Sequence, residues 1–433
     1  MSNSELAILF FLQLAVILGI CRLVGFLARW VGQPQVVGEM IAGVLLGPSL
    51  FGFLLPGLQQ QIFPKGVPMS ILYAVSQVGL VLYMFLIGVE FDTNLIRSRL
   101  RSAVSVSLAG IITPLILGGL LALLLIKQPD LFGKQVSTGE AMLFLGAAIA
   151  ITAFPMLARI IFERGLAGTS LGTLALAAGS TDDAISWCIL AVVLAVFKQN
   201  MFIALLAICG GLLYAIVTLT IGRTVLARTL GVLTERRGGI TGPMLTMVLL
   251  LVMVCGWLTD AIGIYAIFGG FILGIAMPRG LFAKQLRNIL EPVVTNFLLP
   301  LFFVYSGLNT SLGLVNSWIL WGIAILIFIA AVFGKGIACW LAALINKESN
   351  REAMAIGSLM NARGLIELIL LNIGLQQGIV TPTLFTILVL MAIVTTLMAS
   401  PLFELVYGRH RAKETLIQQA DQTEPGSLKE AIV

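Results

Sequence analysis

Uninterrupted apolar segments of about 20 residues recur along the whole chain, and they limit what it can fold into. Each segment is long enough to cross the roughly 30 Å hydrocarbon layer of a bilayer as a helix. Hydrophobic residues make up 59% of the chain, charged residues 11%, and the mean hydropathy is +1.05, which is too apolar for a soluble domain. The segments are continuous rather than alternating, which argues against a β-barrel. We therefore predict an all-α polytopic membrane protein.

The hydropathy pattern predicts about thirteen transmembrane helices. We expect them near residues 6–29, 34–55, 70–90, 102–126, 139–162, 169–197, 201–222, 241–259, 262–278, 289–308, 315–345, 352–376 and 381–407. Only the letters TDAIG separate the eighth segment from the ninth. We predict one transmembrane domain over residues 1–408, followed by a short cytoplasmic tail, 409–433, that is too small to fold alone.

The basic residues predict the orientation and exclude several functions. Most of the 26 lysines and arginines fall between the segments on one side of the membrane, and the other side holds Lys65, Lys127, Lys134 and Lys198. The positive-inside rule then places the N-terminus outside and the C-terminus in the cytoplasm. This distribution explains the net charge of +6 without a nucleic-acid partner. The single histidine, His410, follows the last segment, so we expect neither histidine catalysis nor a cofactor, and we do not expect an enzyme.

Two of the predicted helices are interrupted. The fifth contains AIAITAFPMLAR, with Thr152 and Pro155, and the twelfth contains SLMNARGLIELILLNIG, with Asn361, Arg363 and Gly364. They lie seven segments apart, which places one in inverted orientation relative to the other. Matching interruptions in two inverted repeats indicate crossed discontinuous helices around a transporter's central binding site. The alternative is a proline kink and a packing face of small residues.

Asp182 and Asp183 stand side by side in the sixth segment, LGTLALAAGSTDDAISWCILAVVLAVF. Each charge at mid-bilayer costs about 2.5–3.5 kcal/mol, so the acids must face the bundle or water. The alternative is a helix N-cap in a loop, but the apolar segment before it is too short to cross the membrane. Adjacent helical residues point about 100° apart, so one acid can face an aqueous cavity and the other a protein partner. Lys335, deep in the eleventh segment, is the predicted partner.

The remaining polar residues predict cation and proton exchange. Arg363 and Glu367 are spaced i,i+4 and are expected to pair beside the interruption. Carboxylates, the hydroxyls of Thr152 and Ser180, and freed carbonyls are hard oxygen ligands for a small cation such as Na⁺. Burial favours the protonated carboxyl and a bound cation favours the ionised one, so the two compete. Sodium-coupled organic-solute symport remains an alternative, as does a cation channel, although no TVGYG-like filter is present.

Several stretches resemble the monovalent cation:proton antiporter-2 family, and most closely its plant cation/proton exchangers and their fungal and bacterial relatives. The resemblance runs over nearly the whole membrane region. The stretches that carry it are GQPQVVGEMIAGVLLGPSLFG (32–52), GLVLYMFLIGVEFD (79–92), ITAFPMLARIIFERGL (151–166), STDDAISW (180–187), LTDAIGIYAIFGGFILG (258–274), LLPLFFVYSGL (298–308) and MNARGLIELILLNIG (360–374).

The resemblance implies a mobile core near 102–197 and 315–407, and a dimerisation scaffold near 6–90 and 201–308. It also implies a homodimer in the bilayer, either a bacterial-type inner membrane or a thylakoid membrane. Asp183 matches the family's ion-binding aspartate, and Asp182 and Lys335 match the pair of the members thought to be electrogenic. Plant members usually have Asn-Asp where this chain has Asp-Asp. We expect no nucleotide-binding domain here.

Overall fold

A computed structural model describes residues 2–31, 33, 35–91, 93–128, 130–166, 169–197, 201–308 and 312–408. The predicted tail, 409–433, lies outside the described residues, as do some side chains within helices, including that of Pro155. In the described part, the regular structure is helical, with one isolated antiparallel bridge between Phe132 and Val380. This agrees with the predicted all-α class.

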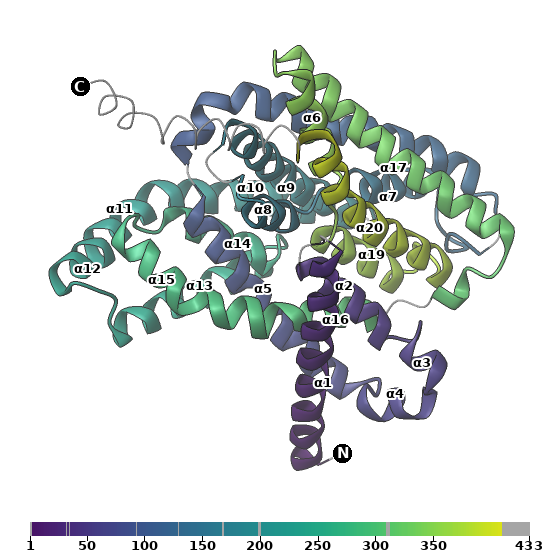
Figure 1. Cartoon of the computed structure of the whole chain (residues 1–433), viewed down its shortest axis with the longest axis horizontal. Helices are drawn as coiled ribbons and strands as arrows, with labels where there is room; N and C mark the ends of the chain where they lie inside the picture. The colour runs from purple at the N-terminus through teal and green to yellow at the C-terminus, as the bar shows by residue number, and fades with distance from the viewer. Residues whose placement is uncertain are drawn as a thin grey trace, which may run out of the picture.

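The helices form two packed groups (Figure 1). In the first, α2 packs on α1 and α16, while α5 packs on α14 and α16. Its members are α1 (Asn3–Trp30), α2 (Gln35–Leu46), α3 (Phe51–Leu54), α4 (Pro56–Ile62), α5 (Val67–Glu90), α10 (Met201–Val217), η1 (Thr218–Gly222), α11 (Arg223–Leu226), η2 (Ala227–Gly231), α12 (Val232–Arg237), α13 (Gly242–Ala261), α14 (Ala266–Ala276), α15 (Leu281–Val293), η3 (Val294–Leu298) and α16 (Leu299–Leu308). α10 also packs on α9 of the second group.

The second group is built around α6, which packs on α7, α9 and α17. Its members are α6 (Thr93–Leu125), α7 (Thr138–Ala150), α8 (Phe154–Glu163), α9 (Ser170–Phe197), η4 (Leu312–Leu314), α17 (Trp318–Ile345), α18 (Asn350–Leu359), α19 (Leu365–Gln376), α20 (Pro382–Phe403) and η5 (Glu404–Gly408). The division into a mobile core and a dimerisation scaffold stays a prediction.

Each of the thirteen predicted segments coincides with a helix or with consecutive helices. Within the described residues, nine helices are long and apolar enough, by length and composition alone, to cross a bilayer. The full count of thirteen crossings stays a prediction. The seventh helix continues past the predicted end at residue 222 to Arg237, and Gly238, with φ of +70°, ends it. The helices α13 and α14 are separate, because the chain turns between them at Gly263 and Tyr265, both with positive φ.

Serine caps begin both interrupted helices. Ser137 at the start of α7 and Ser349 at the start of α18 each form a capping box with the glutamate three residues later. Such a box satisfies backbone N–H groups that the first turn leaves without partners. Each capped helix is short, 13 and 10 residues respectively, and each ends inside the molecule rather than at its surface. The two interruptions are therefore equivalent in local structure.

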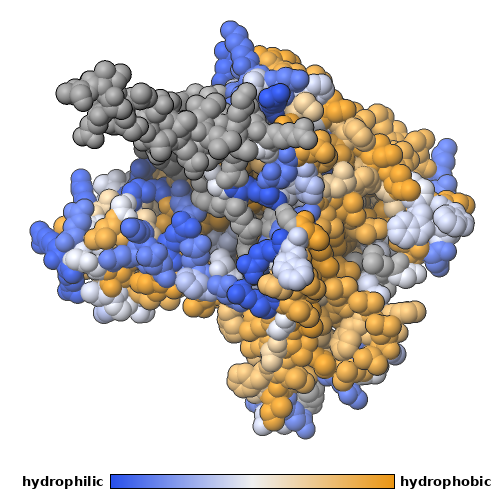
Figure 2. Space-filling model, in the orientation of Figure 1, coloured by the Kyte–Doolittle hydropathy of each residue, from blue (hydrophilic) through white to orange (hydrophobic). Residues whose placement is uncertain are grey.

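The surface fits a lipid environment. Figure 2 shows a broad apolar face over α1 and α17. Large hydrophobic side chains are exposed along both helices, among them Phe11 and Phe26 on α1 and Ile329 and Phe333 on α17. A soluble protein rarely exposes contiguous apolar area of this extent. On α17, the buried Lys335 lies on the side of the helix that faces the interior.

Candidate functional site

The two interruptions cross each other inside the second group. The chain leaves helical geometry at residues 151–153, between α7 and α8, and at 360–364, between α18 and α19. The N–H of Ala153 donates to the carbonyl of Ala362 at 3.1 Å, and the Thr152 hydroxyl donates to the carbonyl of Met360 at 3.2 Å. The predicted crossed discontinuous helices are confirmed. Pro155 is the second residue of α8, a first-turn position where its missing N–H is tolerated, so the break precedes it.

Asp182 lies fully buried beside this crossing and accepts three kinds of donor. The Lys335 ammonium is 3.0 Å from Oδ2, and the Thr152 N–H donates to the same oxygen at 3.1 Å. The Ser107 hydroxyl of α6 donates to Oδ1 at 3.5 Å. Lys335, also fully buried, donates in addition to the carbonyl of Ala150, the last residue of α7. The predicted pairing of Asp182 with Lys335 is present in the structure.

Asp183 is buried, with 3% of its surface exposed, on the neighbouring face of α9. It is set about 100° around the helix from Asp182, so the two carboxylates meet different surroundings. Ser186, one turn further along α9, is fully buried, and its hydroxyl oxygen has no hydrogen-bond partner among the described residues. Ser180 is half-buried and donates to the carbonyl of Ala177 at 3.0 Å, so its partner lies in its own helix rather than at the crossing.

Arg363 caps the carboxyl end of α7. Its Nη1 donates to the carbonyls of Ala148 and Ile151 at 3.2 and 3.3 Å, and its Nη2 donates to that of Ile149 at 2.6 Å. Nη2 also reaches the carbonyl of Ala331 in α17 at 3.4 Å. The last turn of a helix leaves such carbonyls without partners and carries partial negative charge. The guanidinium therefore makes it possible for α7 to end at membrane depth.

Glu367 and Asn361 complete the interruption. Glu367 is fully buried in the first turn of α19, and its Oε2 lies 3.9 Å from Nη1 of Arg363. This is the predicted i,i+4 ion pair, although neither oxygen of Glu367 has a hydrogen bond among the described residues. The negative charge faces the positive end of the α19 dipole, which favours it. Asn361 donates to the carbonyl of Gly357 at 3.1 Å, which satisfies the end of α18.

Two hydroxyl groups at the crossing were not predicted. Ser107 contacts Asp182 from α6, and Thr396 of α20 accepts from the Arg363 N–H at 2.9 Å. Both are fully buried. In the sequence each is one of many hydroxyl residues within apolar helices, and serines and threonines commonly bond to their own helix. Their positions in the sequence therefore did not predict that they contact Asp182 and Arg363.

Five charged side chains are fully or almost fully buried in the described part of the second group. They are Lys335 and Arg363 on one side and Asp182, Asp183 and Glu367 on the other. Asp182 is paired with Lys335, and Glu367 lies beside Arg363. Burial in a low-dielectric interior makes an ionised carboxyl group costly unless a cation is nearby. A monovalent cation or a proton can each neutralise such a carboxylate.

Comparison with a solved structure identifies the class of this fold. The sodium proton antiporter MjNhaP1 of Methanocaldococcus jannaschii superposes with a TM-score of 0.63 at 17% sequence identity, over 93% of this chain and 97% of that one. The fold is therefore that of a sodium/proton antiporter, with the crossed helices at its centre. The predicted fold class is confirmed.

Sequence comparison identifies the family. The family model described as "Sodium/hydrogen exchanger, transmembrane" matches residues 14–406. The Na(+)/H(+) antiporter NhaS4 of Synechocystis sp. is 40% identical over 413 residues, 94% of this chain and 98% of that protein. The chain belongs to the transmembrane sodium/hydrogen exchanger family. It is an integral, multi-pass membrane protein and a cation:proton antiporter, not an enzyme, and the symporter and channel alternatives are not favoured.

Relatives with a larger architecture also match. Cation/H(+) antiporter 18 of Arabidopsis thaliana is 35% identical over 411 residues, 93% of this chain and 50% of that protein. The K(+)/H(+) antiporter 1 of Saccharomyces cerevisiae is 33% identical over 418 residues, 94% of this chain and 47% of that protein. The chain thus spans about half the length of these two relatives. Similarity to plant, fungal and bacterial exchangers is confirmed.

Proposed function

We propose that this protein exchanges one monovalent cation, Na⁺ or K⁺, for H⁺ at Asp183, by alternating exposure of the crossing to the two sides of the membrane. The observation that carries the proposal is the buried Asp183 carboxylate beside the crossing, next to the Asp182 carboxylate that is already paired with Lys335. A cation and a proton each neutralise the Asp183 carboxylate, and they cannot do so together without adding a positive charge. Exchange follows from this competition.

Asp182 and Lys335 have a separate role in this proposal. Their ion pair is fully buried and hydrogen-bonded to the Thr152 N–H and to the end of α7. Breaking one partner of such a pair costs about 3–5 kcal/mol, so the pair holds the crossing in one arrangement. When a cation approaches Asp183, its charge competes with Lys335 for the neighbouring Asp182. The pair therefore links occupancy of the site to the geometry of the crossing.

The cation ligands we propose are oxygen atoms near Asp183. They are its carboxylate, the Thr152 and Ser180 hydroxyls, and backbone carbonyls of the residues between the half-helices. Such hard oxygen ligands suit an alkali cation. Asn361, Arg363 and Glu367 support the crossing by satisfying or neutralising the half-helix ends, with Pro155 in the first turn of α8. The relatives named as Na⁺/H⁺ and K⁺/H⁺ antiporters support both candidate cations.

The remaining features of the proposal concern the whole molecule. The distribution of lysine and arginine supports an N-terminus outside and a C-terminus in the cytoplasm. We propose a homodimer assembled through the first helix group, with the second group as the moving core. We propose a bacterial-type inner membrane or a thylakoid membrane as its location.

The test is proton flux in liposomes that contain the purified protein, driven by Na⁺, K⁺ or Li⁺ over a pH series. We expect Asp183→Asn to reduce cation-dependent proton flux at least a hundredfold, because the neutral amide cannot exchange a proton for a cation. Asp182→Asn is the matched control on the same helix, and we expect it to retain part of the exchange with an altered response to an imposed membrane potential. Unchanged flux in Asp183→Asn would remove Asp183 from the site.

A further inference from the structure

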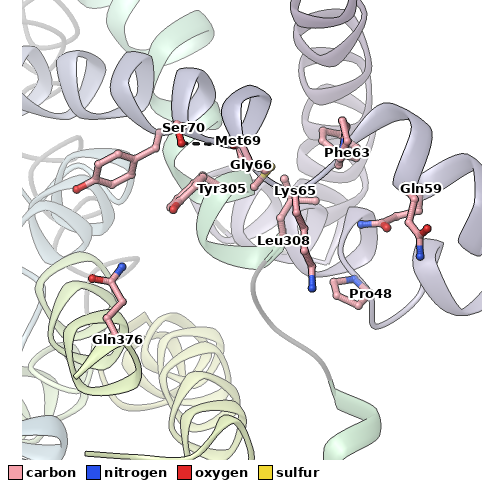
Figure 3. A pocket seen from close by; sticks show the side chains of 13 residues that line it. Pro48, Gln59, Phe63, Lys65, Gly66, Met69, Ser70, Tyr305, Leu308 and Gln376 are labelled. Carbon is pink, nitrogen blue, oxygen red and sulfur yellow. Dashed lines mark hydrogen bonds between the residues drawn. The ribbon is translucent and has the colours of Figure 1, made fainter. Parts of the chain in front are cut away.

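A cavity of about 1010 Å³ lies where α5 begins and where α16 and α19 end (Figure 3). One wall belongs to the first helix group, with Gln59, Lys65, Tyr73 and Tyr305 among its residues, and Gln376 of α19 lies on the opposite side. The cavity therefore opens at the seam between the two groups. Its volume is ample for a hydrated alkali cation and many water molecules.

The lining contains both polar and apolar side chains and carries one charge. Amides, the Ser70 hydroxyl and two tyrosines line it, and the Tyr73 and Tyr305 rings are 5.2 Å apart. Among the described residues of the lining there is no aspartate or glutamate, and Lys65 is the only charged side chain. Lys65 precedes α5 and is exposed. A cavity that leads to a cation site would be expected to carry negative charge, so a lone lysine is the feature that needs an explanation.

The helix α19 runs from the crossing to the wall of the cavity. This helix begins at Leu365, directly after the interruption, and ends at Gln376 in the cavity wall. The helix has 12 residues, and its eleven rises of 1.5 Å place its last residue about 17 Å from its first. The predicted orientation places this end of the molecule on the outer side of the membrane, opposite the cytoplasm. If the proposed function holds, the cavity is the vestibule through which a cation reaches or leaves Asp183 on that side.

We propose that Lys65 is an electrostatic barrier in this vestibule that raises the KM for the cation on this side and speeds cation release to it. A fixed positive charge lowers the local concentration of cations in proportion to exp(−energy/RT), and walls of low dielectric concentrate its field. The same repulsion slows the entry of a cation from this side and speeds its release to this side. It therefore changes the KM on one side without moving the overall exchange equilibrium or the chemistry at Asp183.

The first experiment changes the charge by substitution. Cation-dependent proton flux is measured at low ionic strength with Na⁺ or K⁺ varied on the vestibule side. For charges about 10 Å apart, Lys65→Gln should lower KM about twofold and Lys65→Glu about fourfold, with the maximal rate within twofold of the parent. Lys65→Arg keeps the charge and should keep the parent KM. At about 1 M ionic strength, maintained with an inert salt, the differences should disappear, because the Debye length falls to about 3 Å.

The second experiment changes the charge after folding, so that a folding defect cannot account for the result. Lys65→Cys in liposomes is treated from the vestibule side with an anionic or a cationic methanethiosulfonate reagent that does not cross membranes. The anionic adduct should lower KM and the cationic adduct should restore it. The matched control is Lys134→Cys, because Lys134 is exposed on the same predicted side but lies outside the lining. The parent protein, treated in the same way, shows any effect of the reagents on the native cysteines.

Two results would overturn the barrier. One is a KM that is the same for both adducts and for Lys65→Glu at low ionic strength. The other is an equal change at Lys134, which would indicate a general surface potential rather than a vestibule charge. Both are read against cation-dependent flux of the parent in the same liposomes, so a failure of antiport itself is seen separately, as absent flux in the parent.

Discussion

The Arg363 guanidinium donates to carbonyls on two helices, and this set of contacts depends on the planar shape of the group. A planar guanidinium presents five donors in a fixed fork, whereas an ammonium presents three donors on one atom. Nη1 and Nη2 together reach four carbonyls of α7 and α17. The neighbouring Glu367 carboxylate lies 3.9 Å from Nη1 and forms no hydrogen bond in the described structure. At the residue scale, therefore, Arg363 has a structural role and Glu367 chiefly contributes charge.

We expect Arg363→Lys to lower the melting temperature of the detergent-purified protein by about 5 °C or more, because an ammonium leaves some of the four buried carbonyls unsatisfied. Exchange should fall at least tenfold with it. Arg228→Lys, at an exposed arginine in η2, is the matched control and should change neither quantity. A melting temperature of Arg363→Lys equal to that of the parent would show that the four carbonyls do not need the guanidinium as a donor.

We expect Glu367→Gln to raise the KM for the transported cation about three- to tenfold, because it removes one of three negative charges around the site. The melting temperature should fall as well, because the change removes one partner of the buried ion pair with Arg363. Flux in liposomes and thermal unfolding measure the two quantities. A KM equal to that of the parent would contradict a contribution of the Glu367 charge to cation binding.

At the scale of elements, the crossing consists of two half-helix pairs that satisfy each other. Capping boxes begin α7 and α18, and Arg363 and Asn361 bond to carbonyls near their ends. The extended residues between the half-helices are joined directly, through the Ala153 N–H and the Thr152 hydroxyl. Backbone groups at membrane depth need such partners, because lipid offers none. Each break is thus stabilised by the extended backbone of the other interrupted helix and not by a proline.

We expect Thr152→Val to slow exchange about tenfold, because the isosteric side chain removes the bond to the Met360 carbonyl and a candidate cation ligand. Thr395→Val is the matched control: Thr395 is equally buried, but its hydroxyl donates to Ala392 within α20. That variant should retain exchange within twofold of the parent. Equal losses in both variants would point to a general effect of removing buried hydroxyl groups.

At the scale of the whole molecule, two helix groups meet along a seam that contains the large cavity. All five buried charges of the site lie in the second group, which contains both interrupted helices. Alternating access therefore needs only a displacement of this group against the first. The glycines at the α5–α14 contact support a rigid first group, since a Cβ on Gly88 would lie 2.2 Å from the Phe271 carbonyl. Backbones this close leave little room for sliding.

We expect a membrane-impermeant maleimide, added to intact cells, to label Lys134→Cys and not Arg237→Cys. The positive-inside rule places the first position outside and the second in the cytoplasm. Both positions are exposed in the structure. Permeabilised cells, in which both cysteines should react, provide the control. Labelling of Arg237→Cys alone in intact cells would reverse the orientation, and with it the side that the vestibule faces.

The sequence determined the class, the interruptions and the acids. Continuous apolar segments require helices in a bilayer, and charges inside them are costly enough to identify Asp182, Asp183 and Lys335 without a structure. The same cost predicted that Lys335 pairs with one of the two acids, and the family resemblance implied that this acid is Asp182. Family resemblance then placed these residues in an exchanger. Each of these inferences depends on the charge of a residue and on its position along an apolar segment, and both can be read from the sequence.

Only the tertiary structure decided which groups meet across distant segments. Ser107 and Thr396 look like ordinary helix hydroxyls until α6 and α20 pack on the crossing. The bonds of Arg363 to α7 join residues more than 200 positions apart, and the cavity at Lys65 exists only because α19 ends opposite α5. A hydrogen bond depends on angles and on a few tenths of an ångström, whereas the membrane-spanning segments are recognised from hydropathy. Hydropathy is local in the sequence, and contact geometry is not.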